Sequence, residues 1–174
     1  MRIGAVLAMA VLLWAAPGCK QKRTTPAQAA EQARRIPISV TMGDPRSAQQ
    51  LLGGFFDIED GAWRWTGKQF TVELGTPIGS SGRGANLEFR FTIPPPEIEK
   101  NQSVKLSATV DGNVLPAETY TKAGDYVYKQ DVPASLLNGE SVKVAFQTEK
   151  AFEPGGGDQR ELGVIALSAA LVRK

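Results

Sequence analysis

Strict alternation of apolar and polar side chains is the feature that most constrains how this chain folds. Between Leu87 and Ile93 every second residue is apolar, and the same pattern recurs over residues 104–110 and 142–146. A period of two puts the apolar residues on one face of a β-strand, whereas a helix needs a period of 3.6. No run of helical length after residue 35 has that second period. The sequence therefore predicts an all-β domain.

Further strands are predicted wherever short apolar or alternating runs lie between glycine, proline, asparagine and aspartate residues. These runs cover residues 36–42, 55–58, 62–66, 69–74, 126–132 and 162–172. In the last run the residues that point to either side of the strand are apolar or small, which predicts a central strand covered on both faces. Eight or so short strands without a long helix predict one antiparallel β-sandwich over residues 36–174.

Three local signals predict how the strands are connected. Gly67-Lys68 separates two strand-like runs, which predicts a hairpin turn. Asn138-Gly139 is the dipeptide that a type I′ turn prefers. The three prolines at residues 94–96 stop the strand before them, and we expect them to adopt a polyproline II conformation.

The N-terminus predicts an export signal. Met1-Arg2 precedes an apolar run over residues 3–14, which is shorter than the roughly 20 residues of a transmembrane helix. A positive start, a short apolar core and small residues at its end are typical of a signal peptide, here residues 1–18. Residues 19–35 are a predicted tether whose basic residues either attract an anionic membrane surface or form a solvated linker.

Ala16-Pro17-Gly18-Cys19 resembles the lipoprotein box of bacteria, in which small residues precede a cysteine that receives a thioether-linked diacylglycerol. The resemblance implies a lipidated Cys19, membrane attachment and a location in the bacterial cell envelope, at the outer membrane or the periplasmic face. Cys19 is the only cysteine in the sequence, so it cannot form an internal disulfide. The alternative is ordinary cleavage, which would leave Cys19 as a free thiol.

Composition excludes several functions. Residues 36–174 contain 14 Lys and Arg and 17 Asp and Glu, and this net charge of −3 argues against a nucleic-acid partner. The chain has no histidine, and the domain has no cysteine. Ser-His-Asp triads, Cys-His catalysis and metals bound by imidazole or thiolate are therefore excluded. We predict no catalytic residue, metal or cofactor. Asp57, Glu59 and Asp60 could supply oxygen ligands for calcium, but their spacing is not that of the EF-hand loop, and the alternative is an exposed acidic turn.

Two short motifs carry a second resemblance. Residues 63–67 read Trp-Arg-Trp-Thr-Gly, and residues 158–163 read Asp-Gln-Arg-Glu-Leu-Gly. Together they resemble a jelly-roll, galactose-binding-like module of bacteria, which carries Arg-Trp-Thr near its start and Asp-x-Arg-x-Leu-Gly near its end. Such modules are attached to glycosyltransferases and other envelope-polysaccharide enzymes. The resemblance implies a jelly-roll-like sandwich that handles sugars.

Aromatic residues are the first candidates for ligand contacts. Trp63 and Trp65 share a face of a regular strand, and so do Tyr126 and Tyr128. Flat rings stack on sugars, and each pair would form a platform if it were exposed. The alternative is that the rings fill the core of the sandwich or its edge.

Charged residues before the last strand are the second set of candidates. Asp158, Arg160 and Glu161 lie next to a glycine-rich loop, and Arg160 could donate to sugar hydroxyls or to a carboxylate. The alternative is an internal pair of Arg160 with a carboxylate, which would order the loop.

These patterns predict a non-enzymatic, membrane-anchored envelope lipoprotein whose β-sandwich binds an envelope polysaccharide or docks on an envelope protein. One alternative is a structural or assembly lipoprotein without a ligand site. Another is a carboxylate-based glycoside hydrolase, which would need two carboxyls about 5–10 Å apart across a cleft.

Overall fold

Four phenylalanine rings mark the place where two layers of β-strands meet. Phe70 and Phe146 come from one layer, and Phe89 and Phe91 come from the other. The ring centroids of Phe89 and Phe146 lie 4.6 Å apart, and all four side chains are buried. The alternation in the sequence thus supplies the inner faces of two layers with apolar side chains that pack against each other.

The computed structural model describes residues 35–153, 155 and 157–174. Its elements, in chain order, are β1 (Ser39–Thr41), the 3-10 turn η1 (Pro45–Gln50), β2 (Leu51–Glu59), β3 (Trp63–Gly75), α2 (Ser80–Arg83), β4 (Ala85–Ile93), α3 (Pro95–Asn101), β5 (Val104–Val110), β6 (Asn113–Val114), β7 (Glu118–Tyr120), β8 (Gly124–Val132), η2 (Ala134–Leu136), β9 (Ser141–Thr148) and β10 (Ile165–Arg173).

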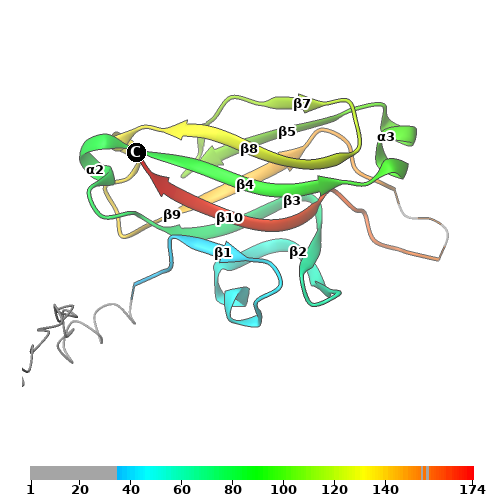
Figure 1. The fold of residues 1–174 in the computed structure, drawn as a ribbon, viewed down its shortest axis with the longest axis horizontal. Helices are drawn as coiled ribbons and strands as arrows, with labels where there is room; N and C mark the ends of the chain where they lie inside the picture. The colour runs from blue at the N-terminus through cyan, green and yellow to red at the C-terminus, as the bar shows by residue number, and fades with distance from the viewer. Residues whose placement is uncertain (1–34, 154, 156) are drawn as a thin grey trace, which may run out of the picture. The chain divides into compact units, whose positions relative to one another are not determined.

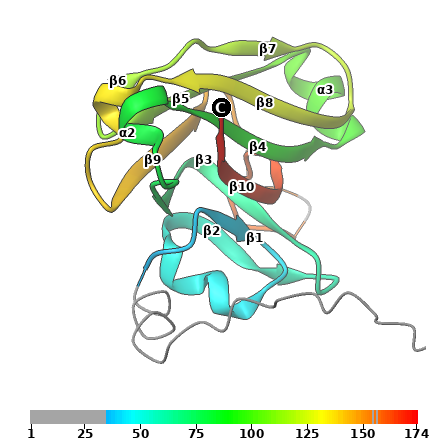
Figure 2. The same cartoon turned by 60° about the vertical axis from the view of Figure 1, so that its left-hand side comes forward.

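The strands form one antiparallel sheet that curls over its own core. One layer has the order β1–β10–β4–β8, and the other has β2–β3–β9–β5 with the short strands β6 and β7 beside β5. The layers are continuous because β3 pairs with β10 at Trp65 and with β9 from Gln69 onward (Figure 1, Figure 2). This arrangement confirms the predicted all-β, jelly-roll-like β-sandwich.

The predicted turn at Gly67-Lys68 is wrong, because β3 runs without a break from Trp63 to Gly75. The hairpin lies earlier, at Asp60-Gly61, where both residues have positive φ (51° and 65°). An Asp-Gly pair with two positive φ angles suits the type I′ turn, whose twist matches that of the strands. Gly67 instead lies where β3 exchanges β10 for β9 as its pairing partner.

Two other local predictions are also wrong. Neither Asn138 nor Gly139 has a positive φ, so the chain forms no type I′ turn there. Pro95 and Pro96 begin helix α3, because the first helical positions tolerate both the fixed φ and the missing N–H of proline. Only Pro94, the N-cap, has extended dihedrals close to polyproline II (φ −74°, ψ 152°).

Strand β10 is central, since it pairs with β4 on one side and with β1 and β3 on the other. The prediction that this strand is covered on both faces, however, is wrong. Ala166, Ala169 and Leu171 are buried, whereas Val172 is 39% exposed. A two-layer sandwich buries only the inner face of each layer, so the small and apolar residues on the outer face of β10 stay partly exposed.

The predicted signal peptide, the predicted lipidation at Cys19 and residues 19–34 of the predicted tether lie outside the described residues. Within the described part of the chain, the helices are too short and too polar to cross a membrane.

Candidate functional site

The two short motifs meet in the structure, although 98 residues separate Thr66 from Val164. The N–H of Thr66 donates to the carbonyl oxygen of Val164 (2.9 Å), and the carbonyl oxygen of Thr66 accepts from Gly163 (2.6 Å). The Thr66 Oγ1 accepts from the N–H of Val164 (3.0 Å). Because Thr66 is fully buried, these bonds hold the segment before β10 against β3.

Arg160 is fixed by two carboxylates. Its Nε and Nη2 donate to Asp158 over 2.8–3.1 Å, and its Nη1 donates to Glu59 Oε1 over 2.9 Å. The hydrogen bonds to Asp158 and then to Glu59 raise the pKa of Arg160, and the hydrogen bonds from Arg160 lower the pKa of Asp158. The predicted internal pair of Arg160 with a carboxylate is therefore present. It leaves two of the five guanidinium N–H groups outside these bonds.

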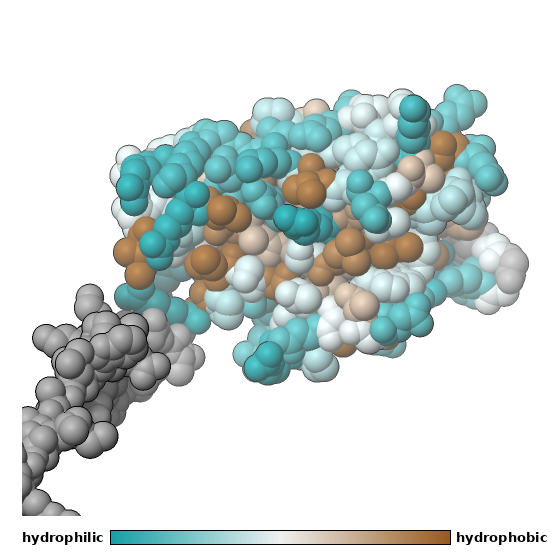
Figure 3. Space-filling model, viewed as in Figure 1, coloured by the Kyte–Doolittle hydropathy of each residue, from teal (hydrophilic) through white to brown (hydrophobic). Residues whose placement is uncertain are grey.

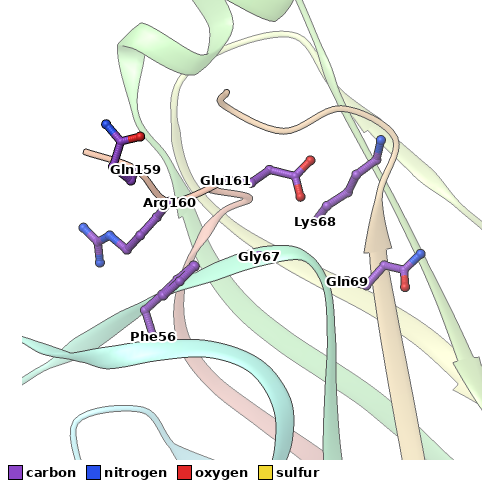
Figure 4. Close-up of a pocket in the computed structure, with 7 residues that line it drawn as sticks. All are labelled: Phe56, Gly67, Lys68, Gln69, Gln159, Arg160 and Glu161. Carbon is purple, nitrogen blue, oxygen red and sulfur yellow. The ribbon is translucent and has the colours of Figure 1, made fainter. Parts of the chain in front are cut away.

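Arg160 lies in the wall of a pocket of about 580 Å³, which we call the Arg160 pocket. Its lining residues are Phe56, Gly67, Lys68, Gln69, Gln159, Arg160 and Glu161. Figure 4 shows Phe56 and Arg160 on one side and Lys68 and Gln69 on the other, with Glu161 between them. The carbon of the Arg160 guanidinium lies 5.1 Å from the centroid of the Phe56 ring.

The chemistry of the Arg160 pocket is mixed rather than strongly charged. Two amides, one ammonium and one guanidinium supply donors, while Glu161 and the amide oxygens supply acceptors. Phe56 adds an apolar surface. A volume of this size falls within the usual range for a small-molecule site. The arrangement suits a ligand with many hydroxyl groups and small apolar patches.

Tyr126 and Tyr128, the two candidate tyrosines, both lie towards the inner face of β8. Tyr128 is fully buried, and its hydroxyl donates to the carbonyl oxygen of Pro116 (2.7 Å). Tyr126 packs against the core, and its hydroxyl donates to the carbonyl oxygen of Lys122 (2.9 Å). Both hydroxyls therefore already have protein partners.

The two tryptophans are partly exposed at the start of β3. Their rings meet edge to face with centroids 6.2 Å apart. Neither side chain lines the Arg160 pocket. Trp65 lies opposite Ile165 of β10, at the junction of the two layers.

Sequence reasoning singled out Asp158, Arg160 and Glu161 but missed four lining residues. Lys68 and Gln69 directly follow the first motif, and Gln159 lies inside the second, so proximity to the motifs is the signal that points to them. Phe56 had no such signal, because only the pairing of β2 with β3 brings it to the pocket.

Glu59 of the acidic turn at residues 57–60 accepts a hydrogen bond from Arg160. Among residues 35–153, 155 and 157–174, no group of three or more His, Cys, Asp or Glu side chains is placed to hold a metal ion.

No protein-family model and no curated protein matches this chain. Among solved structures, a family 35 carbohydrate-binding module from Clostridium thermocellum is similar, with 11% identity and a TM-score of 0.42, over 77% of this chain and 97% of the module. The CBM36-1 domain of a multidomain xylanase from the hindgut metagenome of Trinervitermes trinervoides has 8% identity and a TM-score of 0.36, over 70% of this chain and 89% of that domain.

A family GH115 4-O-methyl-α-glucuronidase with specificity for decorated arabinogalactans has 12% identity and a TM-score of 0.48, over 81% of this chain. This chain spans only 18% of the length of that enzyme. With identities this low and TM-scores below 0.5, these likenesses establish no ligand and no activity for this chain.

Proposed function

We propose that this protein is a membrane-anchored, non-enzymatic envelope lipoprotein whose β-sandwich binds a glycan in the Arg160 pocket. The observation that carries the proposal is the guanidinium of Arg160, held by Asp158 and Glu59 beside the ring of Phe56 at the wall of a polar pocket. A donor that is already fixed loses little side-chain entropy when a ligand binds.

The balance of charge favours a neutral, hydroxyl-rich ligand. Lys68 and Arg160 are cationic, whereas Glu161 and the two carboxylates that hold Arg160 are anionic. Such a pocket has no excess of positive charge to attract phosphate, while its amides and charged groups donate to and accept from hydroxyls. Neutral sugars match this chemistry.

Glu97 is not placed to act as the general acid of a glycoside hydrolase in the Arg160 pocket. A glycoside hydrolase needs a carboxylic acid with a raised pKa beside its substrate. Burial raises the pKa of Glu97 to about 8, but Glu97 is 1% exposed and does not line the Arg160 pocket.

Lys68→Ala tests the binding site with little risk to the fold, because Lys68 is a partly exposed residue of β3. We expect the affinity for the bound glycan to fall at least tenfold, since a hydrogen bond to a charged group contributes about 1.5–3 kcal/mol. The measurement is calorimetric titration of the full-length protein, in mild detergent, with neutral oligosaccharides and polysaccharides. Lys122→Ala, at an exposed position outside the pocket, is the matched control and should bind like wild type. Equal affinities of the two variants would contradict the proposed site.

Cys19→Ala tests the anchor. We expect the variant to move from the membrane fraction to the soluble fraction, because it has no thiol to carry the acyl chains that hold a lipoprotein in a bilayer. Intact-mass measurement of the wild-type protein should show an acylated Cys19. An unmodified thiol on the mature wild-type protein would overturn the lipoprotein assignment.

A second candidate function, docking on an envelope protein, is favoured by apolar side chains on the outer face of the β1–β10–β4–β8 layer. Val127 and Val172 are 42% and 39% exposed on this layer, and Ile38, next to β1, is 41% exposed. Figure 3 shows apolar side chains gathered on the face over β8, β4 and β10. Absence of glycan binding, together with crosslinks from this face to one envelope protein, would favour docking.

A further inference from the structure

A second, smaller groove of about 180 Å³ lies next to the Arg160 pocket on the outer face of β3, β9 and β5, and the two share Gln69. We call it the sheet groove. Its lining residues are Gln69, Thr71, Ser107, Ala108, Thr109, Ala145, Phe146 and Gln147. Figure 1 shows these three strands side by side.

Strand register arranges these side chains in two rows. Gln69 of β3 lies opposite Gln147 of β9, which lies opposite Ser107 of β5. In the next row Thr71 and Thr109 flank Ala145. Two strand spacings span about 10 Å, so the sheet groove is wider than a single sugar ring.

The small side chain of Ala145 explains why the surface is hollowed there. All other residues in the two rows have larger side chains than the methyl group of Ala145. Ala108 and Phe146 also line the groove, but their side chains are buried in the core, so they form part of its floor between the outward-facing residues.

The chemistry of the sheet groove is that of hydroxyls and amides, and none of its eight lining residues is charged. Within the described part of the chain, the side chains of Gln69, Thr71, Thr109 and Gln147 make no hydrogen bond to another protein group. Their donors and acceptors therefore face solvent and are available to a ligand. These lining residues offer no counter-charge to a charged polymer, whereas their hydroxyls and amides match sugar hydroxyls.

We infer that the ligand is an extended, uncharged oligosaccharide of several residues, which occupies the Arg160 pocket and continues through Gln69 into the sheet groove. This inference rests on the proposed glycan binding and deepens it, because it replaces a single terminal sugar by a chain as the recognised unit. In this arrangement the sheet groove supplies additional hydrogen bonds to the sugar residues beyond the first one.

The test is a titration of the full-length protein with linear, uncharged oligosaccharides of glucose, xylose, mannose and galactose that contain one to six residues. For the sugar that binds, we expect the six-residue chain to bind at least tenfold more tightly than the single residue, because two or three added hydrogen bonds contribute about 1 kcal/mol each. Ala145→Gln, which fills the groove, should abolish that gain and leave the affinity for the single residue unchanged.

Two further variants make the test specific. Ala170→Gln makes the same change on the outer face of β10, in the other layer, and should keep the full gain with length. The double variant Thr71→Val with Thr109→Val removes two hydroxyls, and valine still favours the strand conformation. We expect it to reduce the gain in affinity with chain length several-fold. Affinity independent of chain length, or a full gain in Ala145→Gln, would overturn this inference alone. Failure of every oligosaccharide to bind would overturn the proposed function together with it.

Discussion

Replacing Glu97 by glutamine will raise the free energy of unfolding by about 4 kcal/mol at pH 8 and change it little near pH 4. Burial raises the pKa of the Glu97 carboxyl from 4.5 to about 8. At 1.36 kcal/mol for each pH unit, the buried carboxylate costs the folded state about 4–5 kcal/mol once it is ionised. Glutamine has the size and polarity of the protonated acid and stays neutral at every pH.

Three prolines explain why the buried carboxyl of Glu97 has no hydrogen-bond partner. Glu97 is the third residue of α3, a position from which a glutamate side chain normally reaches the N–H of the N-cap. Here the N-cap is Pro94, and the next two residues are Pro95 and Pro96, so none of the three has an N–H. Both carboxyl oxygens of Glu97 are buried without a hydrogen-bond partner.

The sign of the pH dependence follows from the raised pKa. Above about pH 4.5 the unfolded chain loses the Glu97 proton, while the folded protein keeps it up to about pH 8. The folded state then binds more protons, so its stability falls as the pH rises through this window and levels off above it.

Urea unfolding of wild type, Glu97→Gln and Glu99→Gln at pH 4.5, 6 and 8 measures the effect. Glu99 is an exposed residue of the same helix, so its variant should follow wild type at each pH. If Glu97→Gln showed the same fall in stability between pH 4.5 and 8 as wild type, the fall would belong to other groups.

Gly163→Ala will destabilise the protein by about 3 kcal/mol and lower its melting temperature by about 10 °C. A Cβ at Gly163 would lie 2.5 Å from the carbonyl oxygen of Gly67 and 2.6 Å from Thr66 Oγ1. Backbone atoms cannot move aside as a side chain can. The hydrogen bonds that hold the second motif against β3 would therefore be strained or lost.

The matched control is Gly67→Ala, in the partner strand of the same contact. A Cβ at Gly67 meets its nearest atom at 3.7 Å, which is an ordinary van der Waals distance. We expect this variant to unfold within about 1 kcal/mol of wild type, as measured by thermal and urea denaturation. If both substitutions lowered the stability equally, close packing around Gly163 would not be the cause of the destabilisation.

Local patterns predicted the layers of this fold better than its turns. The alternation from Leu87 to Ile93 depends only on which side chains are apolar, and the structure buries those residues as β4. Turns depend on what the flanking strands pair with. Gly67-Lys68 resembles a turn in isolation, yet pairing with β10 and then β9 keeps the chain extended through it.

The candidate site was predictable only in part, for the same reason. Asp158 and Arg160 lie two residues apart, so their pairing can be inferred from one segment. Phe56, Lys68 and Arg160 come together only through β2, β3 and the segment before β10. The tyrosines show the opposite case, since period two places Tyr126 and Tyr128 on one face but cannot say that this face is the inner one.

The amino-acid sequence by itself determined that this chain folds as strands in two layers, because the period of apolar residues is a local property. It also determined which chemistries are excluded, because histidine and domain cysteines are absent from it. Only the tertiary structure decided where the Arg160 pocket and the sheet groove lie. Both surfaces are made by strand register and by contacts between residues up to about 100 positions apart, and no segment carries that information alone.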